Sequence, residues 1–171
     1  MNRTASPSEG PDINRLAPLA VIAASVFALA TAFWAQYGFG IEPCPLCLYQ
    51  RAAYAVAGLV GLAALFAAPA DKRALVIGLA GVVFALGAGV ALYHVGVEQH
   101  WWASAVCTAG NDKAPATVEQ LRALLTAKPA KPCDEKDWTL FGVSMATYNV
   151  GASVALALGC FWSAQRMRTK S

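Results

Sequence analysis

Four long stretches without any charged residue divide the chain, and the charged residues gather between them. These stretches cover residues 16–41, 52–70, 74–97 and 138–165. A helix needs about 20 apolar residues to cross the roughly 30 Å hydrocarbon layer of a bilayer, and each stretch is near or above that length. The pattern therefore predicts four transmembrane helices, at about residues 16–38, 47–68, 74–96 and 142–165.

The composition supports a membrane protein rather than a soluble one. Hydrophobic residues make up 57% of the chain and charged residues 13%, whereas soluble domains carry about 25% charged residues. The first stretch is long and ends near Trp34 and Tyr37 rather than at a small-residue cleavage site, so it does not resemble a cleaved signal peptide. We expect an all-α fold, a bundle of four transmembrane helices.

The distribution of basic residues predicts the orientation of the bundle. Basic residues precede the first helix, lie in the turn between the second and third helices, and follow the fourth helix. They are Arg3, Arg15, Lys72, Arg73, Arg166, Arg168 and Lys170. By the positive-inside rule, these segments and both termini are expected in the cytoplasm. Residues 1–14 then form a disordered cytoplasmic tail, residues 166–171 a second tail, and residues 97–141 a long periplasmic loop. The net charge of +3 needs no nucleic acid partner, because the basic residues flank membrane spans.

Four of the five cysteines are predicted to face the compartment outside the cytoplasm. Cys44 and Cys47, the membrane-edge pair, occur in the sequence CPLC at the outer start of the second helix. Cys107 and Cys133, the loop pair, lie in the long loop, whereas Cys160 falls inside the fourth helix and is expected to be a buried apolar residue. The spacing of the loop pair suits a loop-closing disulfide, which could be purely structural or open to exchange. A bacterial periplasm would keep such disulfides oxidised.

The position of the membrane-edge pair points to reactive thiols. The N-terminus of a helix stabilises a thiolate, and Pro45 is suited to the first turn. Cys47 lies deeper in that turn and is the better candidate for the thiolate. Arg51 follows one turn later on the same face, where it could stabilise a thiolate or a ligand carbonyl, although an interfacial anchor is an alternative role.

Thiols that form a new disulfide must pass two electrons to an acceptor, and we expect this acceptor to be dissolved in the membrane. A C-x-x-C sequence also serves zinc and soft-metal sites, but the loop pair lacks the close spacing of a second metal-binding pair. No metal or flavin motif occurs in the sequence, so we expect no metal cofactor. A quinone fits, because the membrane-edge pair lies at a depth that a quinone ring can reach.

The sequence resembles a known family at several separate positions. Residues 44–51, CPLCLYQR, resemble the C-x-x-C-x-Y-x-R signature of the DsbB family of bacterial membrane proteins. His94 lies thirteen positions before Cys107, as in that family. Similar matches follow Cys133, at Trp138, Gly142 and Met145. The resemblance covers about residues 15–165.

The resemblance implies a quinone-dependent protein disulfide oxidoreductase of the inner membrane. Such a protein reoxidises a periplasmic DsbA-like dithiol protein of thioredoxin fold and passes two electrons to ubiquinone or menaquinone. Both pairs, Cys44–Cys47 and Cys107–Cys133, would be redox-active disulfides. Cys107 would form the mixed disulfide with the partner, after which Cys133 would pair with Cys44.

The same resemblance implies where the quinone binds. Cys47 would be released as a thiolate beside the quinone ring and would be charge-paired with Arg51. His94 and Met145 would line the quinone site, although His100 is a second histidine near the outer surface.

Two other functions remain open from the sequence. A paralogue could oxidise one dedicated partner enzyme instead of serving general protein folding, because the loop that selects the partner cannot be interpreted from its sequence. A non-catalytic scaffold or metal-binding protein could use Cys44 and Cys47 as ligands. An enzyme like vitamin K epoxide reductase is disfavoured, because its C-x-x-C opens a later helix.

Overall fold

Four long helices make up most of the part of the protein that can be described. The computed structural model describes residues 12–104, 106–107, 117–119, 122, 131–136 and 138–170. Its long helices are α1 (Ile13–Gly38), α2 (Pro45–Leu62), α3 (Ala70–Glu98) and α5 (Met145–Lys170), and α2 continues into a π-helical turn, η1 (Ala63–Ala67). All four are long and apolar enough to cross a membrane. The predicted, mainly helical architecture with four helices long and apolar enough to span a membrane is thereby confirmed.

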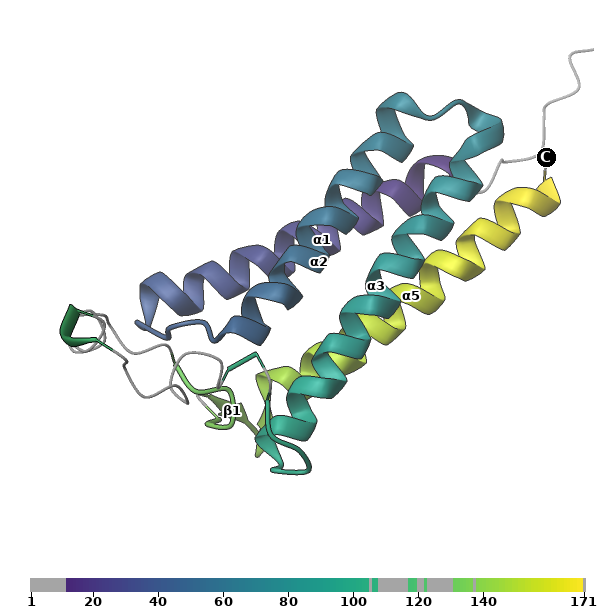
Figure 1. Cartoon of the computed structure of the whole chain (residues 1–171). Helices are drawn as coiled ribbons and strands as arrows, with labels where there is room; N and C mark the ends of the chain where they lie inside the picture. Colours follow the sequence, from purple (N-terminus) through teal and green to yellow (C-terminus); the bar gives the residue numbers. More distant parts are fainter. Residues whose placement is uncertain are drawn as a thin grey trace, which may run out of the picture.

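The helices run up and down in sequence order, so that alternate connections meet at the same end of the bundle (Figure 1). The start of α1, the turn between η1 and α3 and the end of α5 lie at one end. The connection from α1 to α2 and the segments on either side of the loop pair lie at the other. All of the candidate redox residues outside the helices are therefore gathered at a single end.

Small residues allow the helices to approach closely. Ala57 of α2 and Ala80 of α3 have no exposed surface, and Phe84 of α3 is among the largest fully buried side chains. A Cβ atom added at Gly81 would lie only 3.0 Å from the ring of Phe161 on α5. Helix contacts in membranes commonly use small residues in this way, because apolar side chains gain little from leaving lipid.

The outer faces of the helices are apolar as well. Large hydrophobic side chains are exposed along every helix, including Phe27, Leu59, Leu86 and Leu158. In water such a surface would be a large exposed apolar patch, but in a bilayer it meets lipid.

The helix ends differ from the predicted ones for local reasons. Asp12 caps α1, because its side chain accepts a hydrogen bond of 3.0 Å from the backbone N–H of Asn14. Two residues of the predicted tail are therefore helical, and residues 1–11 lie outside the described residues. At the other terminus, α5 remains helical as far as Lys170, through most of the predicted second tail.

A small hairpin precedes α5, so this helix begins at Met145 and not at the predicted residue 142. The strands β1 (Thr139–Leu140) and β2 (Val143–Ser144) pair in antiparallel fashion. Phe141 and Gly142 between them have φ angles of 51° and 79°, as both central residues of a type I′ turn require. The sequence analysis did not predict this hairpin. The middle of the predicted loop, including residues 108–116 and 123–130, lies outside the described residues.

Candidate redox site

The start of α2 fixes the geometry of the membrane-edge pair. Cys44 is the N-cap residue, with extended backbone angles, and its Sγ accepts a hydrogen bond of 3.3 Å from the backbone N–H of Cys47. Pro45 occupies the first turn, where its missing N–H has no cost. The two sulfur atoms lie 2.8 Å apart and are not joined by a disulfide in this structure. The backbone N–H of Cys47, one of the free N–H groups at the start of the helix, is therefore directed at the sulfur of Cys44.

The two thiols of this pair are not equivalent. The pKa of Cys44 is raised well above its ordinary value, first because its side chain is hydrogen-bonded to Cys47 and then because it is buried. Cys44 is therefore a thiol at neutral pH. Its S–H can donate to the sulfur of Cys47, and such a bond stabilises negative charge on Cys47.

His94 of α3 lies against this pair. Its Nε2 is 3.6 Å from the Sγ of Cys44, and its Nδ1 is 2.9 Å from the side-chain nitrogen of Gln50. Because the amide of Gln50 donates to Nδ1, the hydrogen of the neutral ring is on Nε2, which faces Cys44. Glu98 follows one turn later, with a carboxylate oxygen 3.8 Å from the same Nε2.

His100 has a different environment. Its side chain is 74% exposed, and its Nε2 lies 3.9 Å from a carboxylate oxygen of Asp134. Of the two histidines, only His94 lines the cavity that also contains the membrane-edge pair.

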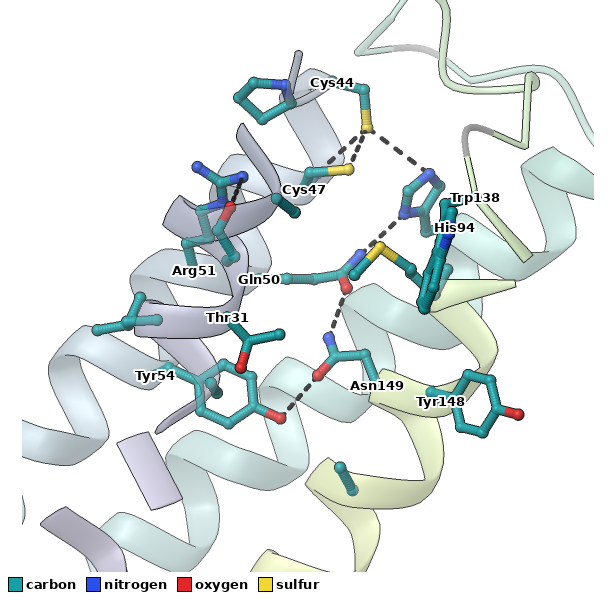
Figure 2. A pocket seen from close by; sticks show the side chains of 18 of the residues that line it. Thr31, Cys44, Cys47, Gln50, Arg51, Tyr54, His94, Trp138, Tyr148 and Asn149 are labelled. Carbon is teal, nitrogen blue, oxygen red and sulfur yellow. Dashed lines mark hydrogen bonds between the residues drawn. The ribbon is translucent and has the colours of Figure 1, made fainter. Parts of the chain in front are cut away.

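A ladder of polar side chains continues from His94 into the bundle. The side-chain oxygen of Gln50 accepts a hydrogen bond from the amide of Asn149 on α5. The hydroxyl of Tyr54 donates to the other end of that amide at 2.7 Å, and it lies 3.2 Å from the hydroxyl of Ser153. The ladder joins α2, α3 and α5, with the ring of His94 at the end nearest Cys44 (Figure 2). Gln50, Tyr54 and Asn149 were not predicted as site residues, although a polar side chain inside a predicted transmembrane helix was a signal.

Arg51 connects α2 to α1 at the mouth of the same cavity. Its guanidinium donates to the side-chain oxygen of Gln36 and, at 3.2 Å, to the backbone carbonyl of Ala32. It also lies 5.3 Å from the centre of the Phe33 ring, a cation–π distance. Arg51 is thus held in place by α1 while it lines the cavity next to Cys47.

A cavity of about 600 Å³ brings the predicted residues together. Cys44, Cys47, Arg51, His94 and Met145 all line it. The remainder of its wall comes mainly from apolar residues of α1 and α5, including Ala28, Leu29, Ala152 and Leu156. One end is therefore polar and carries the thiols, while the other is apolar and lies deep between two helices. This division suits a ligand with a polar ring and a long apolar tail.

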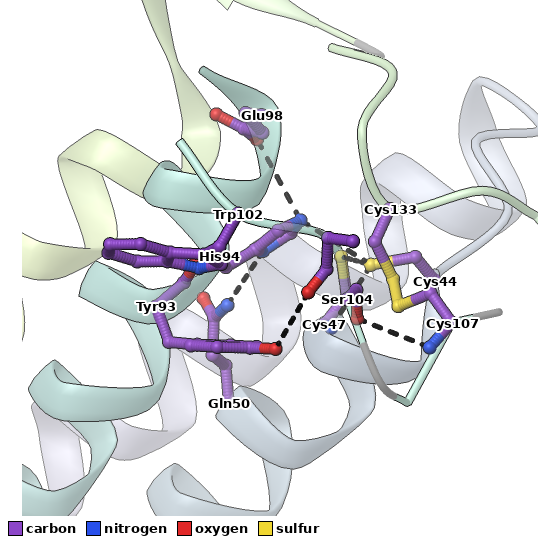
Figure 3. The surroundings of a disulfide bond; sticks show 11 residues. Cys44, Cys47, Gln50, Tyr93, His94, Glu98, Trp102, Ser104, Cys107 and Cys133 are labelled. Carbon is purple, nitrogen blue, oxygen red and sulfur yellow. Dashed lines mark hydrogen bonds and ion pairs between the residues drawn. A yellow bond between two sulfur atoms is a disulfide. The ribbon is translucent and has the colours of Figure 1, made fainter. Parts of the chain in front are cut away.

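The loop pair is a disulfide and lies beside the membrane-edge pair (Figure 3). The Cα atoms of Cys107 and Cys133 are 6.0 Å apart. Cys133 is 1% exposed and packs in one cluster with Cys44, Leu46 and Val97, whereas Cys107 is half-buried. Only Cys107 of the loop pair is therefore partly accessible, because Cys133 packs onto the start of α2.

Residues just after α3 hold Cys107 in this position. The indole N–H of Trp102 donates to the carbonyl of Tyr93 at 3.2 Å, and the two rings stack with centroids 5.8 Å apart. The hydroxyl of Ser104 accepts a hydrogen bond of 3.2 Å from the backbone N–H of Cys107. A Cβ atom at Gly96 would lie 2.0 Å from the Trp102 ring, so only glycine permits this arrangement.

Comparison with known proteins identifies the family. The model of the family "Disulfide bond formation protein DsbB" matches residues 14–163. A Disulfide bond formation protein B from Methylobacillus flagellatus is 34% identical over 138 residues, which cover 79% of this chain and 83% of the relative. One from Acinetobacter baumannii is 30% identical over 86% of this chain and 89% of the relative. No solved structure gives a significant match. The chain therefore belongs to the DsbB family of disulfide bond formation proteins, and it is a multi-pass protein of the bacterial inner membrane.

Proposed function

We propose that this protein reoxidises a periplasmic DsbA-like dithiol protein of thioredoxin fold and passes the electrons to ubiquinone or menaquinone. One observation carries the proposal: the loop disulfide packs against Cys44, and Cys44 and Cys47 lie at the polar end of a cavity that is otherwise apolar. Electrons from a soluble partner could thus reach a membrane-dissolved acceptor through two adjacent cysteine pairs. Family membership supports the disulfide chemistry.

The first step is exchange between the partner and the loop pair. A thiolate of the reduced partner attacks a sulfur of the Cys107–Cys133 disulfide and forms a mixed disulfide. The half-buried Cys107 is the accessible sulfur, and the buried Cys133 leaves as the thiolate. The second partner thiol then attacks the mixed disulfide, so that the partner is oxidised and Cys107 is released.

The second step transfers the electrons to the membrane-edge pair. Cys133 is the member of the loop pair that packs in the cluster with Cys44. When the membrane-edge pair is oxidised, attack of the Cys133 thiolate on Cys44 forms a Cys44–Cys133 disulfide and releases Cys47 as a thiolate. Arg51 next to the cavity offsets this negative charge, which would otherwise be costly at the edge of the hydrocarbon layer. Attack of Cys107 on the sulfur of Cys133 then re-forms the loop disulfide and releases Cys44, so that Cys44 and Cys47 together hold the two electrons.

The residues around the cavity fit a quinone. The ring would lie at the polar end between Cys47, Arg51, His94 and Met145, and the isoprenoid tail would follow the apolar wall between α1 and α5. When bound, the quinone accepts the two electrons and two protons that thiol oxidation releases. Arg51 and the Nε2–H of His94 can donate hydrogen bonds to the carbonyl oxygens of the quinone. The ladder below His94 holds the imidazole ring in one orientation.

We further propose the orientation that this route requires. The end of the bundle with the cysteine pairs would face the periplasm, where the soluble partner is found. Both termini and the turn near Lys72 would then face the cytoplasm, in agreement with the positive-inside rule.

An assay with purified components tests the proposal. Protein in detergent or nanodiscs is mixed with quinone and a reduced DsbA-like protein, and quinone reduction is followed by its absorbance. We expect continuous reduction that requires both the protein and the dithiol partner, and that is lost in Cys47→Ser. The absence of reduction with every candidate partner, or full activity of Cys47→Ser, would disprove the proposed function. Reduction with only one specialised partner would instead identify a dedicated paralogue.

A further inference from the structure

Three potential metal ligands meet at the polar end of the cavity. The sulfur atoms of Cys44 and Cys47 and a ring nitrogen of His94 all lie within 4.8 Å of one another. They come from two rigid elements, the start of α2 and the last turns of α3. Cys44 is 3% exposed and His94 is 5% exposed, so the two are screened from water. Two thiols and one imidazole form a ligand set that zinc uses in proteins.

Glu98 gives a second, independent sign of a cation at this place. Its side chain is only 6% exposed, and one of its oxygens lies 3.8 Å from Nε2 of His94. Its other oxygen, Oε2, is buried and has no hydrogen-bond partner within the described part of the chain. A buried carboxylate oxygen without a partner carries a desolvation cost that a nearby cation would remove. Glu98 also lines the cavity that contains the three ligands.

We propose that the dithiol form of this protein binds one Zn²⁺ through Cys44, Cys47 and His94, with Glu98 completing a four-coordinate site. On binding, the two thiols release two protons, and the two thiolates balance the charge of the ion. With the Glu98 carboxylate as the fourth ligand, the site carries one net negative charge, the same as before zinc binds, so binding adds no net charge at the edge of the membrane. The site forms only when the membrane-edge pair is reduced, because the sulfurs of a disulfide are not thiolate ligands.

The local geometry needs only a small adjustment. Two thiolates held at about 2.3 Å from a tetrahedral zinc ion lie about 3.7 Å apart, whereas the sulfurs here are 2.8 Å apart. The half-buried Cys47 has the room to turn. Gln50 already contacts the Nδ1 of His94. When the amides of Gln50 and Asn149 both turn over, the Gln50 oxygen can accept the Nδ1–H of a metal-bound ring, and the Gln50 nitrogen can donate to the Asn149 oxygen.

Zinc in this site would stop the proposed reaction. With both sulfurs bound to the ion, Cys44 and Cys47 cannot form a disulfide, so the protein is held in its reduced form until zinc leaves. This consequence rests on the proposed function, but zinc binding itself does not. Zinc would thus act as a reversible inhibitor and not as a resident cofactor.

The test measures zinc binding by the full-length protein in two redox states. A Cys107→Ser/Cys133→Ser/Cys160→Ala background leaves Cys44 and Cys47 as the only cysteines. The protein is reduced or oxidised, desalted without oxygen and titrated with Zn²⁺ against a chromophoric chelator. We expect one zinc ion per reduced chain and none per oxidised chain. The oxidised protein is the matched control, because it has the same sequence and fold. Co²⁺ in place of Zn²⁺ should give the absorption of a tetrahedral thiolate site.

Variants of the other two ligands complete the test. In the reduced background, His94→Ala should weaken zinc binding by at least about a hundredfold, and Glu98→Gln by about ten- to a hundredfold. Zinc bound equally by both redox states, no zinc bound by the reduced form, or full affinity in His94→Ala would each overturn the proposal. Full affinity in Glu98→Gln would overturn the four-coordinate site. These results do not depend on quinone reduction, so failure of the proposed function remains distinguishable from failure of the zinc site.

Discussion

The membrane-edge pair and the loop pair are held in place by different parts of the structure. Cys44 and Cys47 occupy the cap and first turn of α2, and one backbone amide of that turn is hydrogen-bonded to the sulfur of Cys44. The loop pair joins two irregular segments, one of which is fastened to α3 through Trp102. The membrane-edge pair is thus positioned by regular secondary structure, whereas the loop pair is positioned by side chains and by its own disulfide.

This difference suits the two kinds of exchange that we propose. A pair that reacts with a ligand in a fixed cavity benefits from rigid positioning, because reaction rates depend on small displacements. A pair that must accept a thiolate from a soluble protein needs a segment that can move. The fully buried Cys133 links the two, since it belongs to the loop but packs with Cys44.

Substitution of one cysteine in each pair should have the largest effect and should separate the two roles. We expect Cys47→Ser and Cys133→Ser each to lower quinone reduction by at least about a thousandfold, or about 4 kcal/mol. Only Cys133→Ser should accumulate a mixed disulfide between Cys107 and the partner. In this variant the free Cys107 thiol attacks the disulfide of the oxidised partner, one partner thiol leaves, and no Cys133 thiol is present to attack the Cys107 sulfur. Non-reducing gel electrophoresis measures this species.

Cys160 provides the matched control for these substitutions. It lies in the apolar cluster that the four long helices share, which contains neither cysteine pair, and it is 5% exposed. Cys160→Ala should keep the full rate of quinone reduction. An equal accumulation of mixed disulfide in Cys47→Ser and Cys133→Ser would contradict the division of roles between the pairs.

The second prediction concerns Arg51, which should affect only the membrane-edge pair. Arg51→Ala removes the charge next to Cys47 and the hydrogen bonds to α1, so we expect the KM for quinone to rise by about ten- to a hundredfold. Exchange between the partner and the loop pair should remain near its normal rate in single-turnover experiments. Arg51→Lys keeps the charge but lacks the planar guanidinium group, so its KM for quinone should lie between those of the unchanged protein and Arg51→Ala. A loss of exchange with an unchanged KM would instead make Arg51 a structural anchor.

The overall architecture could be predicted from the sequence because lipid imposes a simple requirement. About 20 uncharged apolar residues in a row have few alternatives to a transmembrane helix, so the four helices follow from the charge pattern alone. The start of α2 could also be predicted to within two residues, since Pro45 is typical of the first turn of a helix. The hairpin at Phe141 was not, because two strands of two residues each give almost no periodic pattern.

The site itself could be predicted only in part. The C-x-x-C spacing and the four-residue step to Arg51 are local, so the sequence places these residues together. The contact of His94 with Cys44 joins two different helices and depends on how each is rotated about its axis. The same holds for Gln50 and Asn149, whose hydrogen bond crosses from α2 to α5. Uniformly apolar helices give little indication of which face turns inward.

The third prediction tests the support of the loop pair. In Gly96→Ala the new methyl group cannot fit beneath the Trp102 ring, so that ring and the segment leading to Cys107 must move. We expect a loss of about 1–3 kcal/mol in the free energy of unfolding, as overpacking commonly causes, together with slower exchange with the partner. Gly89→Ala, on the same helix, is the control, because nothing lies within 4 Å of the added atom. Normal exchange in Gly96→Ala would show that Trp102 does not position Cys107.

The smallest effect is expected from the ladder beneath the membrane-edge pair. Tyr54→Phe removes the hydroxyl that donates to Asn149 and lies near Ser153, and it leaves the oxygen of the half-buried Asn149 with one partner fewer. We expect the free energy of unfolding, measured in mixed micelles, to fall by about 1 kcal/mol. Exchange at the loop pair should not change, because Tyr54 packs in the apolar cluster of the helices and not in the cluster that contains Cys107 and Cys133.

Tyr148→Phe is the counterpart of this substitution on the loop side of the molecule. Its hydroxyl donates to the carbonyl of Leu140 in the hairpin at 3.1 Å, but that site is exposed to solvent. Water can replace the lost bond there, so the stability should change by no more than about 0.5 kcal/mol. If both variants lost the same stability, the buried ladder would contribute no more than an exposed hydrogen bond. The rigid positioning of the membrane-edge pair would then have to come from the start of α2 alone.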